Sequence, residues 1–232
     1  MFSVIFEVQP QASQWNNYLE TAKSLKPSLE KVPGFVRNIR YRSLQRDGWI
    51  LSLSDWQDEK ALVRWRTRPS HHHAQENGRQ SILADYHLRV GQVAADDNSG
   101  HGGQAAPSLP RGDLTEVGDG PVVSLLERTI PPDQLQGVRD EELARSLGLA
   151  LPMPGLLSWD LFDAVLSPGD VILLCTWRDE PAAWRFVATL GKDLEQPQSH
   201  RVVRVIRDYG KYDRREAPQY YPDVPGGESL HA

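Results

Sequence analysis

The central part of each half of the chain carries the same pattern of residues. Each copy has a glycine, an apolar segment that ends in tryptophan, an Asp-Glu pair and an alanine, all in the same register. These are Gly34, Trp49–Trp56, Asp58-Glu59 and Ala61 in the first copy, and Gly155, Val171–Trp177, Asp179-Glu180 and Ala182 in the second. A match of this length without a gap predicts a duplicated structural unit of about a hundred residues. At 232 residues, the chain is long enough for each half to bury a modest core of its own.

The first half predicts the order strand, helix, strand, strand, helix, strand. The strands are expected at 4–8, 35–44, 49–56 and 86–93, and the helices after the predicted N-cap Ser13 and after Asp58. The Asp47-Gly48 pair is typical of a hairpin turn between the second and third strands. Pro27 is expected to bend or break the first helix before its end. This order is that of a ferredoxin-like unit, in which helices cover one face of an antiparallel sheet.

The second half repeats this order after a polar interval. Its strands are expected at 122–129, 156–166, 171–177 and 200–206, and its helices within 132–149 and at 180–190. The chain therefore divides into a first unit (1–94), a flexible linker rich in Gly, Asp, Ser and Pro (95–120), a second unit (121–206) and a C-terminal tail (207–232). One such sheet alone leaves a face bare. We therefore expect an α+β protein in which the antiparallel sheets of two ferredoxin-like (βαββαβ) units pack as one intramolecular barrel.

The charge balance excludes some classes of partner. The formal net charge is −5 and the Lys and Arg residues are scattered, so we expect no nucleic-acid partner. No apolar run approaches the roughly 20 residues of a spanning helix, and Met1 leads into an alternating segment rather than a charged leader. The sequence therefore predicts a cytoplasmic protein with no membrane partner. The single cysteine, Cys175, lies in an apolar run and is expected to be a small buried hydrophobe.

Several segments of the first unit carry a resemblance to a known family. They are Phe6-Glu7-Val8, Val32-Pro33-Gly34-Phe35, Ser52-Leu53-Ser54-Asp55-Trp56 and Ala61 to Trp65. Together they resemble the antibiotic biosynthesis monooxygenase (ABM) domain of the dimeric α/β-barrel superfamily. The likeness covers most of 2–93, and 122–206 resemble a more diverged second copy. The resemblance implies an intramolecular dimeric α/β barrel. The family includes enzymes that oxidise aromatic compounds with dioxygen without metal or flavin, haem-degrading enzymes, and many proteins with no known reaction.

Three consecutive histidines, His71, His72 and His73, are the most conspicuous candidates for chemistry. Consecutive side chains on a helix point about 100° apart, whereas metal ligands on a helix converge at positions i and i+4. The residue four positions after His71 is Gln75, so we predict no metal site. At most one or two of these histidines can face inward, where a neutral imidazole accepts a proton near neutral pH. We therefore assign His71 and His72 as candidate catalytic residues.

The spacing between Trp56 and Trp65 resembles the haem-degrading branch of the family. In that branch a haem-ligating histidine follows ten residues after the second tryptophan, where this chain has Gln75, and the first strand carries an asparagine that is missing here. A register slip would bring His72 or His73 to the ligand position. We therefore expect no cofactor, and keep haem binding or haem degradation as a lesser alternative.

A comparison of the two units separates scaffold from candidate chemistry. Ser52 and Ser54 share a strand face, and their counterparts in the second unit are the more apolar Leu173 and Cys175. The second unit also lacks the three histidines. We therefore expect a functional pocket between the sheet and the helices of the first unit. Its candidate substrate-binding residues are Phe6, Arg40, Tyr41, Trp49, Ser54, Trp65 and Tyr86.

The resemblance implies a cofactor-independent, monooxygenase-like enzyme that oxidises an aromatic or quinonoid small molecule with dioxygen. In this scheme His71 or His72 removes a proton from a phenol or enol, Trp65 forms a wall of the pocket, and the resulting anion reduces dioxygen. The alternative is a non-catalytic small-molecule binder or pathway accessory protein, which would bind its ligand without oxygen uptake. We expect a monomer whose units pair within the chain, or a further homodimer of such monomers.

Overall fold

The computed structural model describes residues 1–96, 117–190 and 198–212 of the chain. The strands are β1 (Phe2–Pro10), β2 (Phe35–Ser43), β3 (Ile50–Trp56), β4 (Leu83–Asp96), β5 (Val122–Thr129), β6 (Leu156–Ala164), β7 (Asp170–Trp177) and β8 (Gln198–Gly210). The helices are α1 (Trp15–Leu29), α2 (Glu59–Arg66), α3 (Pro69–Asn77), α4 (Pro132–Leu135), α5 (Asp140–Ser146) and α6 (Glu180–Thr189), with a short 3-10 helix η1 (Ala12–Gln14) and a short π-helix η2 (Gly78–Ile82). Each half therefore follows the order expected for a ferredoxin-like unit.

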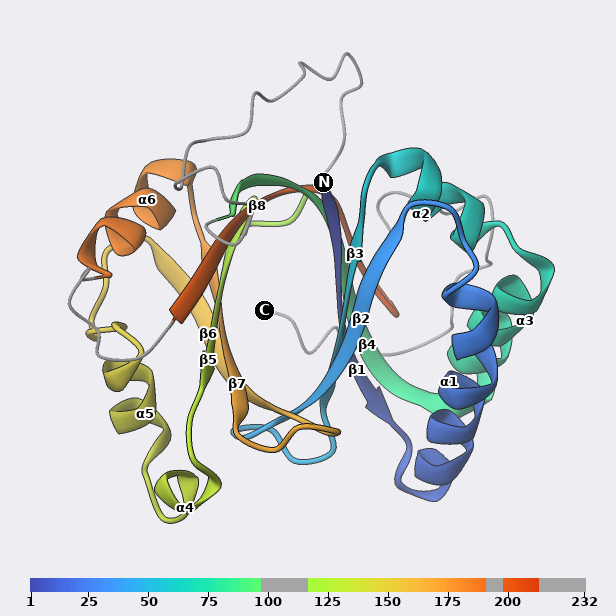
Figure 1. Cartoon of the computed structure of the whole chain (residues 1–232), viewed down its shortest axis with the longest axis horizontal. Helices are drawn as coiled ribbons and strands as arrows, with labels where there is room; N and C mark the ends of the chain where they lie inside the picture. Colours follow the sequence, from blue (N-terminus) through green and yellow to red (C-terminus); the bar gives the residue numbers. More distant parts are fainter. Residues whose placement is uncertain (97–116, 191–197, 213–232) are drawn as a thin grey trace.

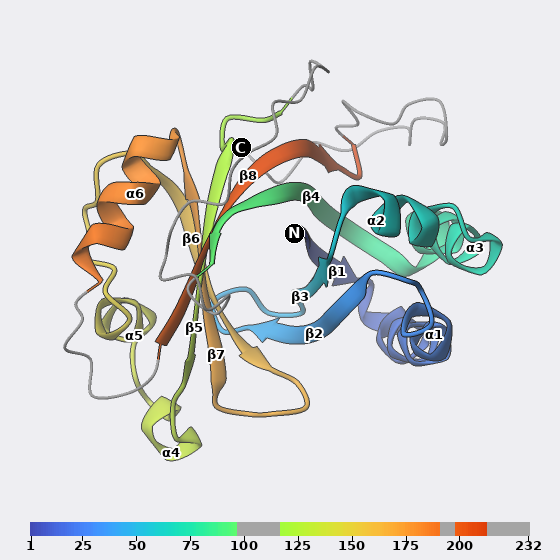
Figure 2. The same cartoon turned by 45° about the horizontal axis from the view of Figure 1, so that its top comes forward.

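The strands form one closed antiparallel barrel in the order β1-β3-β2-β6-β7-β5-β8-β4. Within each half the fourth, first, third and second strands lie side by side, and the halves join where β2 pairs with β6 and β4 pairs with β8. Helices α1 to α3 cover the outside of the barrel on one side, and α4 to α6 cover the opposite side (Figure 1). The view in Figure 2 shows the same separation of the two helical layers. The predicted intramolecular α/β barrel is confirmed.

The repeated residues have the same structural roles in both units. The side chains of Asp58 and Asp179 cap α2 and α6, each accepting a hydrogen bond 2.8 Å long from the backbone N–H of the repeated alanine. The repeated glycines have φ of 87° and 85°, and a Cβ added at either would lie 2.6 or 2.5 Å from that alanine's Cβ. The duplication therefore preserves one local packing unit, in which glycine is required because its backbone is left-handed and closely approached.

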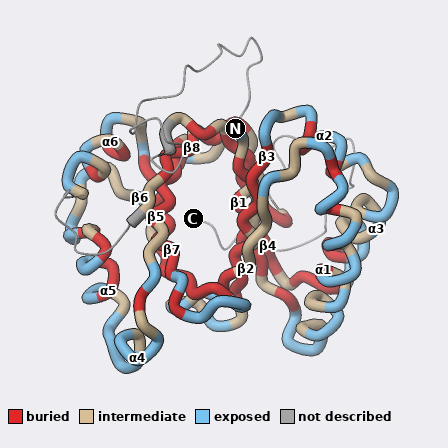
Figure 3. The backbone as a smooth tube through the Cα atoms, in the orientation of Figure 1, coloured by how far each residue is buried: buried red, intermediate tan, exposed pale blue. Residues whose placement is uncertain are grey.

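Strand alternation sorts the side chains into an inner and an outer layer. Ile5, Leu53 and Leu125 belong to an apolar cluster inside the barrel. The repeated tryptophans, Trp56 and Trp177, belong to separate clusters that include residues of the covering helices. Buried positions follow the barrel strands, whereas exposed positions lie on the outer faces of the helices (Figure 3). The barrel is therefore packed on both faces of its wall.

A buried charge network links the units inside the barrel. The carboxylate of Glu7 accepts hydrogen bonds from Arg46 and Arg89, and Arg46 Nε donates to Asp160 of β6 at 2.7 Å. Burial opposes the ionisation of Glu7, but the Arg89 and Arg46 charges outweigh it and lower the pKa of Glu7 to about 2. This network supports the seam at which β2 and β6 pair over only a short stretch.

Several element boundaries differ from the sequence-based expectations. Ser13 lies in η1 and the N-cap of α1 is Gln14, while α1 continues through Pro27 to Leu29 without the predicted break. Strand β4 extends to Asp96, into the predicted linker, and β8 extends to Gly210, so residues 207–210 are strand rather than tail. The polar end of β8 is held by pairing with β4, where His87 Nε2 and Asp208 Oδ1 are 2.5 Å apart. The rest of the predicted linker from 97 to 116, and of the predicted tail from 213 onward, lies outside the described residues.

Among the helices of the described residues, none combines the length and the apolar character needed to cross a membrane.

Candidate functional site

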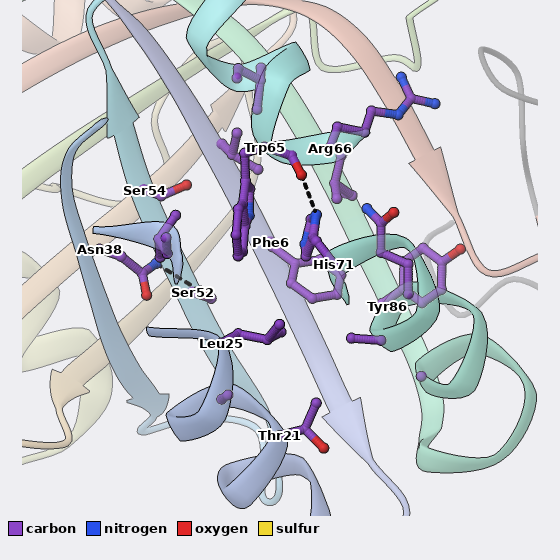
Figure 4. A pocket seen from close by; sticks show the side chains of 18 of the residues that line it. Phe6, Thr21, Leu25, Asn38, Ser52, Ser54, Trp65, Arg66, His71 and Tyr86 are labelled. Atoms are coloured by element: carbon purple, nitrogen blue, oxygen red, sulfur yellow. Dashed lines mark hydrogen bonds between the residues drawn. The ribbon is translucent and has the colours of Figure 1, made fainter. Parts of the chain in front are cut away.

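A cavity of about 240 Å³ lies between the outer face of the β1–β4 sheet and helices α1 to α3 (Figure 4). Its apolar walls include Val4, Leu25 and Leu62, which come from β1, α1 and α2. Arg207 and Tyr209 of β8 also line it, so the second unit contributes to a cavity in the first. The volume lies below the roughly 300–1,000 Å³ of pockets for drug-sized ligands, which favours a small ligand.

One side of the cavity is a polar patch on β2 and β3 (Figure 4). Asn38 Nδ2 donates to Ser52 Oγ at 3.1 Å and to the Leu53 carbonyl at 3.2 Å. Ser54 Oγ accepts a hydrogen bond 3.0 Å long from Trp56 Nε1. A serine hydroxyl has one proton to donate in addition to its lone pairs. Within the described ranges, neither Ser52 nor Ser54 has an acceptor for that proton, so both are available as donors to a ligand.

His71 of α3 lies across the cavity from this patch and is held by Trp65 (Figure 4). The two rings stack with centroids 4.3 Å apart and an angle of 21° between planes. His71 Nδ1 lies 3.2 Å from the Trp65 carbonyl oxygen. A carbonyl can only accept, so Nδ1 carries the proton in the neutral ring and Nε2 is left as an acceptor. Burial lowers the pKa of His71 to about 4, which keeps the imidazole neutral at pH 7.

Two further aromatic rings form part of the wall. Phe6 and Tyr86 pack edge to face with centroids 5.7 Å apart. The Tyr86 hydroxyl accepts a hydrogen bond 2.8 Å long from Arg79 Nη1. Arg79 comes from η2, which directly follows the helix that carries His71. The wall therefore combines flat apolar surfaces with a fixed phenol.

Five cationic side chains line the cavity, and two of them are paired with carboxylates outside its lining: Lys26 with Glu30 at 3.8 Å and Arg207 with Glu59 at 3.0 Å. Among the residues that line it are Lys26, Arg40, Arg66, Arg79 and Arg207, whereas no carboxylate is found among the lining residues of the described ranges. Burial raises the pKa of Tyr18 on α1, and the neighbouring guanidinium of Arg40 opposes that rise by its charge and a hydrogen bond. A low-dielectric cavity lined by one sign of charge concentrates ligands of the opposite sign. The geometry therefore suits an apolar molecule that carries an anionic group.

The structure brings together most, but not all, of the residues proposed from the sequence. Phe6, Arg40, Ser54, Trp65, His71 and Tyr86 line the cavity. Tyr41 does not, because it follows Arg40 in β2 and alternation sends it into the apolar cluster inside the barrel. Trp49 is buried elsewhere, beneath the guanidinium of Arg46, whose Cζ lies 4.4 Å from the ring centroid. His72 follows His71 on α3 and is not a lining residue.

Other lining residues were not proposed from the sequence. Asn38 could have been found, because it lies two residues before Arg40 on the same face of β2. Tyr18 and Arg79 had no comparable signal in the sequence. Arg207 and Tyr209 depend on the pairing of β8 with β4, which joins residues far apart in the chain.

The residues present do not fit a metal or haem. Within the described ranges, no group of three or more His, Cys, Asp or Glu side chains is placed to bind a metal ion. His71 Nε2 is the one histidine nitrogen with a free lone pair in the cavity lining described here, but a porphyrin is larger than a drug-sized ligand and exceeds a cavity of about 240 Å³. The exposed His73 lies against Asn77 instead. No chemical step is therefore assigned to haem.

Comparison with known proteins identifies the class. The family model for antibiotic biosynthesis monooxygenase matches residues 1–77. A protein of Pyricularia oryzae named jasmonate monooxygenase ABM is 49% identical over 225 residues, which cover 96% of this chain and 99% of the relative. The chain therefore belongs to the antibiotic biosynthesis monooxygenase family, and its function is monooxygenase-like.

Two solved structures are similar to the chain over most of its length. A proposed monooxygenase from Lactobacillus acidophilus NCFM is 9% identical with a TM-score of 0.38, over 89% of this chain and 94% of the other. An anthrone oxidase-like protein is 13% identical with a TM-score of 0.37, over 93% of this chain and 95% of the other. Scores this low have no bearing on chemistry, and the fold rests on the strand pairing described above.

Proposed function

We propose that this chain is a cofactor-independent monooxygenase that oxidises a small, apolar carboxylate of the jasmonate class in the cavity of the first unit. The observation that supports this most directly is the composition of the cavity. Its walls are apolar and aromatic, five cationic side chains line it, and carboxylates are missing from its described lining. A neutral histidine with an available Nε2 lies at one side.

The substrate class follows from the charge of the cavity and from the relative. Jasmonate is a small carboxylate with a cyclopentanone ring and an apolar side chain, which matches both the cations and the largely apolar walls. The relative that carries this name is 49% identical over nearly its whole length, and the aligned region spans the cavity of the first unit. A carboxylate in this cavity would be desolvated among guanidinium groups, where charge-assisted hydrogen bonds are strong.

The proposed chemistry begins with proton removal beside His71. Nε2 accepts a proton from an acidic C–H or O–H of the substrate, and the resulting anion reduces dioxygen directly. A pKa of about 4 makes His71 available as a base but a weak one. Arg66 lines the same end of the cavity, and its charge is one of the causes that lower the pKa of His71. The same charge stabilises a substrate anion formed there.

The electron balance restricts the products. Oxidation of a CH₂ group to a carbonyl by one dioxygen, with release of water, needs no further electrons. Hydroxylation of a C–H bond by one dioxygen, with release of water, needs two electrons from an added reductant. A cofactor-independent reaction therefore predicts a carbonyl product, or a hydroperoxide before water is lost.

A second candidate substrate is an aromatic or quinonoid phenol. The stacked pair of Trp65 and His71 favours it, because a flat ring can pack against a flat wall. Such a substrate would need no carboxylate, and its phenolic oxygen would be the anion formed beside His71. The non-catalytic alternative uses the same cavity but predicts binding without oxygen uptake.

The experiment is an oxygen-uptake assay on the purified full-length protein with jasmonic acid, with an anthrone and with haemin in separate runs. Uptake with jasmonic acid and incorporation of ¹⁸O from labelled dioxygen would support the proposal. Oxygen uptake with the anthrone but not with jasmonic acid would support an aromatic or quinonoid phenol as the substrate. Saturable binding of jasmonic acid, with no oxygen uptake either in the presence or in the absence of an added reductant, would favour a non-catalytic binder. A saturable change in the haemin spectrum would contradict the cofactor-independent scheme.

A further inference from the structure

The polar patch of the cavity is a set of cross-strand neighbours. Arg40 of β2 lies opposite Ser52 of β3, and Asn38 lies opposite Ser54, two positions away in the register. All four line the cavity, as alternation requires for residues two apart on each strand. Side chains directly opposite each other on antiparallel strands have Cβ atoms about 4.5–5.5 Å apart. The Arg40 stem and the Ser52 hydroxyl are therefore close enough to contact one ligand group together.

The hydrogen bonds of this patch leave donors, rather than acceptors, facing the ligand. Asn38 Nδ2 is fixed by the Leu53 carbonyl, which can only accept, so the same amide nitrogen donates to Ser52 Oγ. Trp56 Nε1 likewise can only donate to Ser54 Oγ. Each hydroxyl thus has a lone pair occupied and its proton without an acceptor in the described part of the chain. Within the described residues, Arg40 Nε is also buried without a hydrogen-bond partner, although the same guanidinium interacts with the Tyr18 side chain. A group rich in acceptors, such as a carboxylate, would satisfy this set.

The second unit shows that the fold does not need this polarity. The pair equivalent to Arg40 and Ser52 is Leu161 and Leu173, and both leucines are fully buried in an apolar cluster. Cys175 stands at the position equivalent to Ser54 and belongs to the same cluster.

The repeated tryptophan makes the same point. Trp177 Nε1 donates to Ser124 of the neighbouring strand at 2.8 Å, so its N–H is satisfied without a serine at position 175. The same strands are therefore filled with packed side chains in one unit and with ligand-facing donors in the other. The difference points to binding rather than to stability.

We infer that Arg40, Ser52 and Ser54 form a carboxylate-binding subsite that anchors the substrate across the cavity from His71. This deepens the proposed function and rests on it for the identity of the substrate. Arg40 supplies the charge and the two serines supply neutral donors, with Asn38 and Trp56 as positioning residues. With its carboxylate bound at this subsite, the substrate extends its apolar part toward Trp65 and His71. The carboxylate is then bound at one side of the cavity, and the carbon to be oxidised lies at the other side.

The test compares an acid with its neutral ester, because only the acid carries the anion. Octanoate and methyl octanoate serve as probes, and their binding to the full-length protein is measured by calorimetry. Wild type should bind the acid more tightly than the ester. Arg40→Met should weaken acid binding by about 10- to 100-fold, the range of a lost charge-assisted hydrogen bond, and leave ester binding unchanged. Ser52→Ala should reduce the same preference by a smaller factor, and Arg40→Lys should retain part of it.

Arg64→Met is the matched control, because Arg64 lies on the exposed side of α2 outside the cavity and has the same charge. It should leave the preference for the acid unchanged. Circular dichroism of each variant shows whether it is folded, and unchanged ester binding by Arg40→Met and Ser52→Ala shows that their cavities are intact.

A wild type that does not prefer octanoate, or that binds neither probe, would overturn the subsite. So would equal loss of acid and ester binding in Arg40→Met. If the acid preference depends on Arg40 but jasmonic acid is neither bound nor oxidised, the subsite stands and the proposed substrate fails.

Discussion

Arg201 of β8 donates two hydrogen bonds from Nη1 to the Asp55 carboxylate of β3, 2.8 and 2.9 Å long. The pair joins the last strand of the second unit to the third strand of the first. The equivalent contact in the other direction is made by Arg89 of β4, whose Nη1 donates to Thr176 Oγ1 of β7 at 2.8 Å. The two contacts are related by the duplication, since Asp55 and Thr176 both directly precede the repeated tryptophan. A residue of each unit therefore completes the interior of the other.

Loss of the Asp55 carboxylate should destabilise the whole barrel. Asp55→Asn leaves Arg201 and Arg37 without their shared buried anion, and a buried ion pair broken on one side costs about 3–5 kcal/mol. Urea denaturation of wild type and variant at pH 7 measures the change. Glu142→Gln, which removes an exposed partner of Arg139, is the control and should leave the midpoint unchanged. An Asp55→Asn midpoint equal to that of wild type would contradict this view of the interior.

The repeated glycines should be equally intolerant of a side chain. Gly34→Ala and Gly155→Ala each place a Cβ against the repeated alanine on backbone of positive φ, and we expect each to cost about 2–5 kcal/mol. Gly48→Ala is the control, since its φ is 74° but nothing lies within 4 Å of an added Cβ. It should cost only about 1–2 kcal/mol. Thermal or chemical denaturation compares the three, and a Gly48→Ala variant as unstable as the other two would remove the packing argument.

The buried state of His71 predicts a dependence of stability on pH. Its pKa falls from 6.5 in the unfolded chain to about 4 in the folded protein, so the unfolded chain binds the extra proton between these values. The stability contributed by neutral His71 is complete above pH 6.5 and is lost as the pH falls toward 4, by roughly 3 kcal/mol at most. His71→Phe keeps a ring against Trp65 without a titrating group. Between pH 7 and pH 4.5 wild type should lose unfolding free energy relative to this variant, and a constant difference would show that His71 does not titrate as described.

The two histidines proposed from the sequence should differ in their effect on turnover. His71→Phe removes the Nε2 acceptor from the cavity and should lower kcat by about 10²- to 10⁴-fold on any substrate that the protein oxidises. His72→Phe changes a residue outside the cavity lining and should leave kcat unchanged. Steady-state oxygen uptake measures both. Equal losses would mean that the helix orientation, rather than Nε2, carries the effect, and unchanged turnover in His71→Phe would remove this residue from the mechanism.

The local features of the fold were predictable because each depends on neighbours in sequence. The order of strands and helices and the turn at Asp47-Gly48 follow from periodicity and turn chemistry. The caps at Asp58 and Asp179 are equally local. Their repetition predicted two equivalent units, and the bare sheet faces of such units predicted a barrel. The end of β8 was not predictable in this way, because its polar residues read as tail and are strand only through their pairing with β4.

The candidate site was predictable where strand alternation carried the signal. Ser52 and Ser54 share the strand face that the sequence predicted to be polar, and both line the cavity. Tyr41 and Trp49 were misplaced because propensity alone does not tell which face of a strand meets the helices and which meets the barrel. Which of His71 and His72 faces the cavity depends on the orientation of α3 about its axis. That orientation is set by packing, including the stacking of His71 on Trp65.

By itself, the sequence determined the duplicated unit, its repeated glycines and Asp-Glu pairs, and the polar strand face that distinguishes the first half from the second. These are properties of residues near one another in the chain, and local geometry suffices for them. Tertiary structure decided the rest: the order in which the strands of the two units meet in the barrel, the delivery of Arg207 and Tyr209 to the cavity of the other unit, and the tautomer of His71. Each of these depends on contacts between segments far apart in sequence. The free energy of such contacts comes from burial and strand pairing, which a local sequence pattern does not specify.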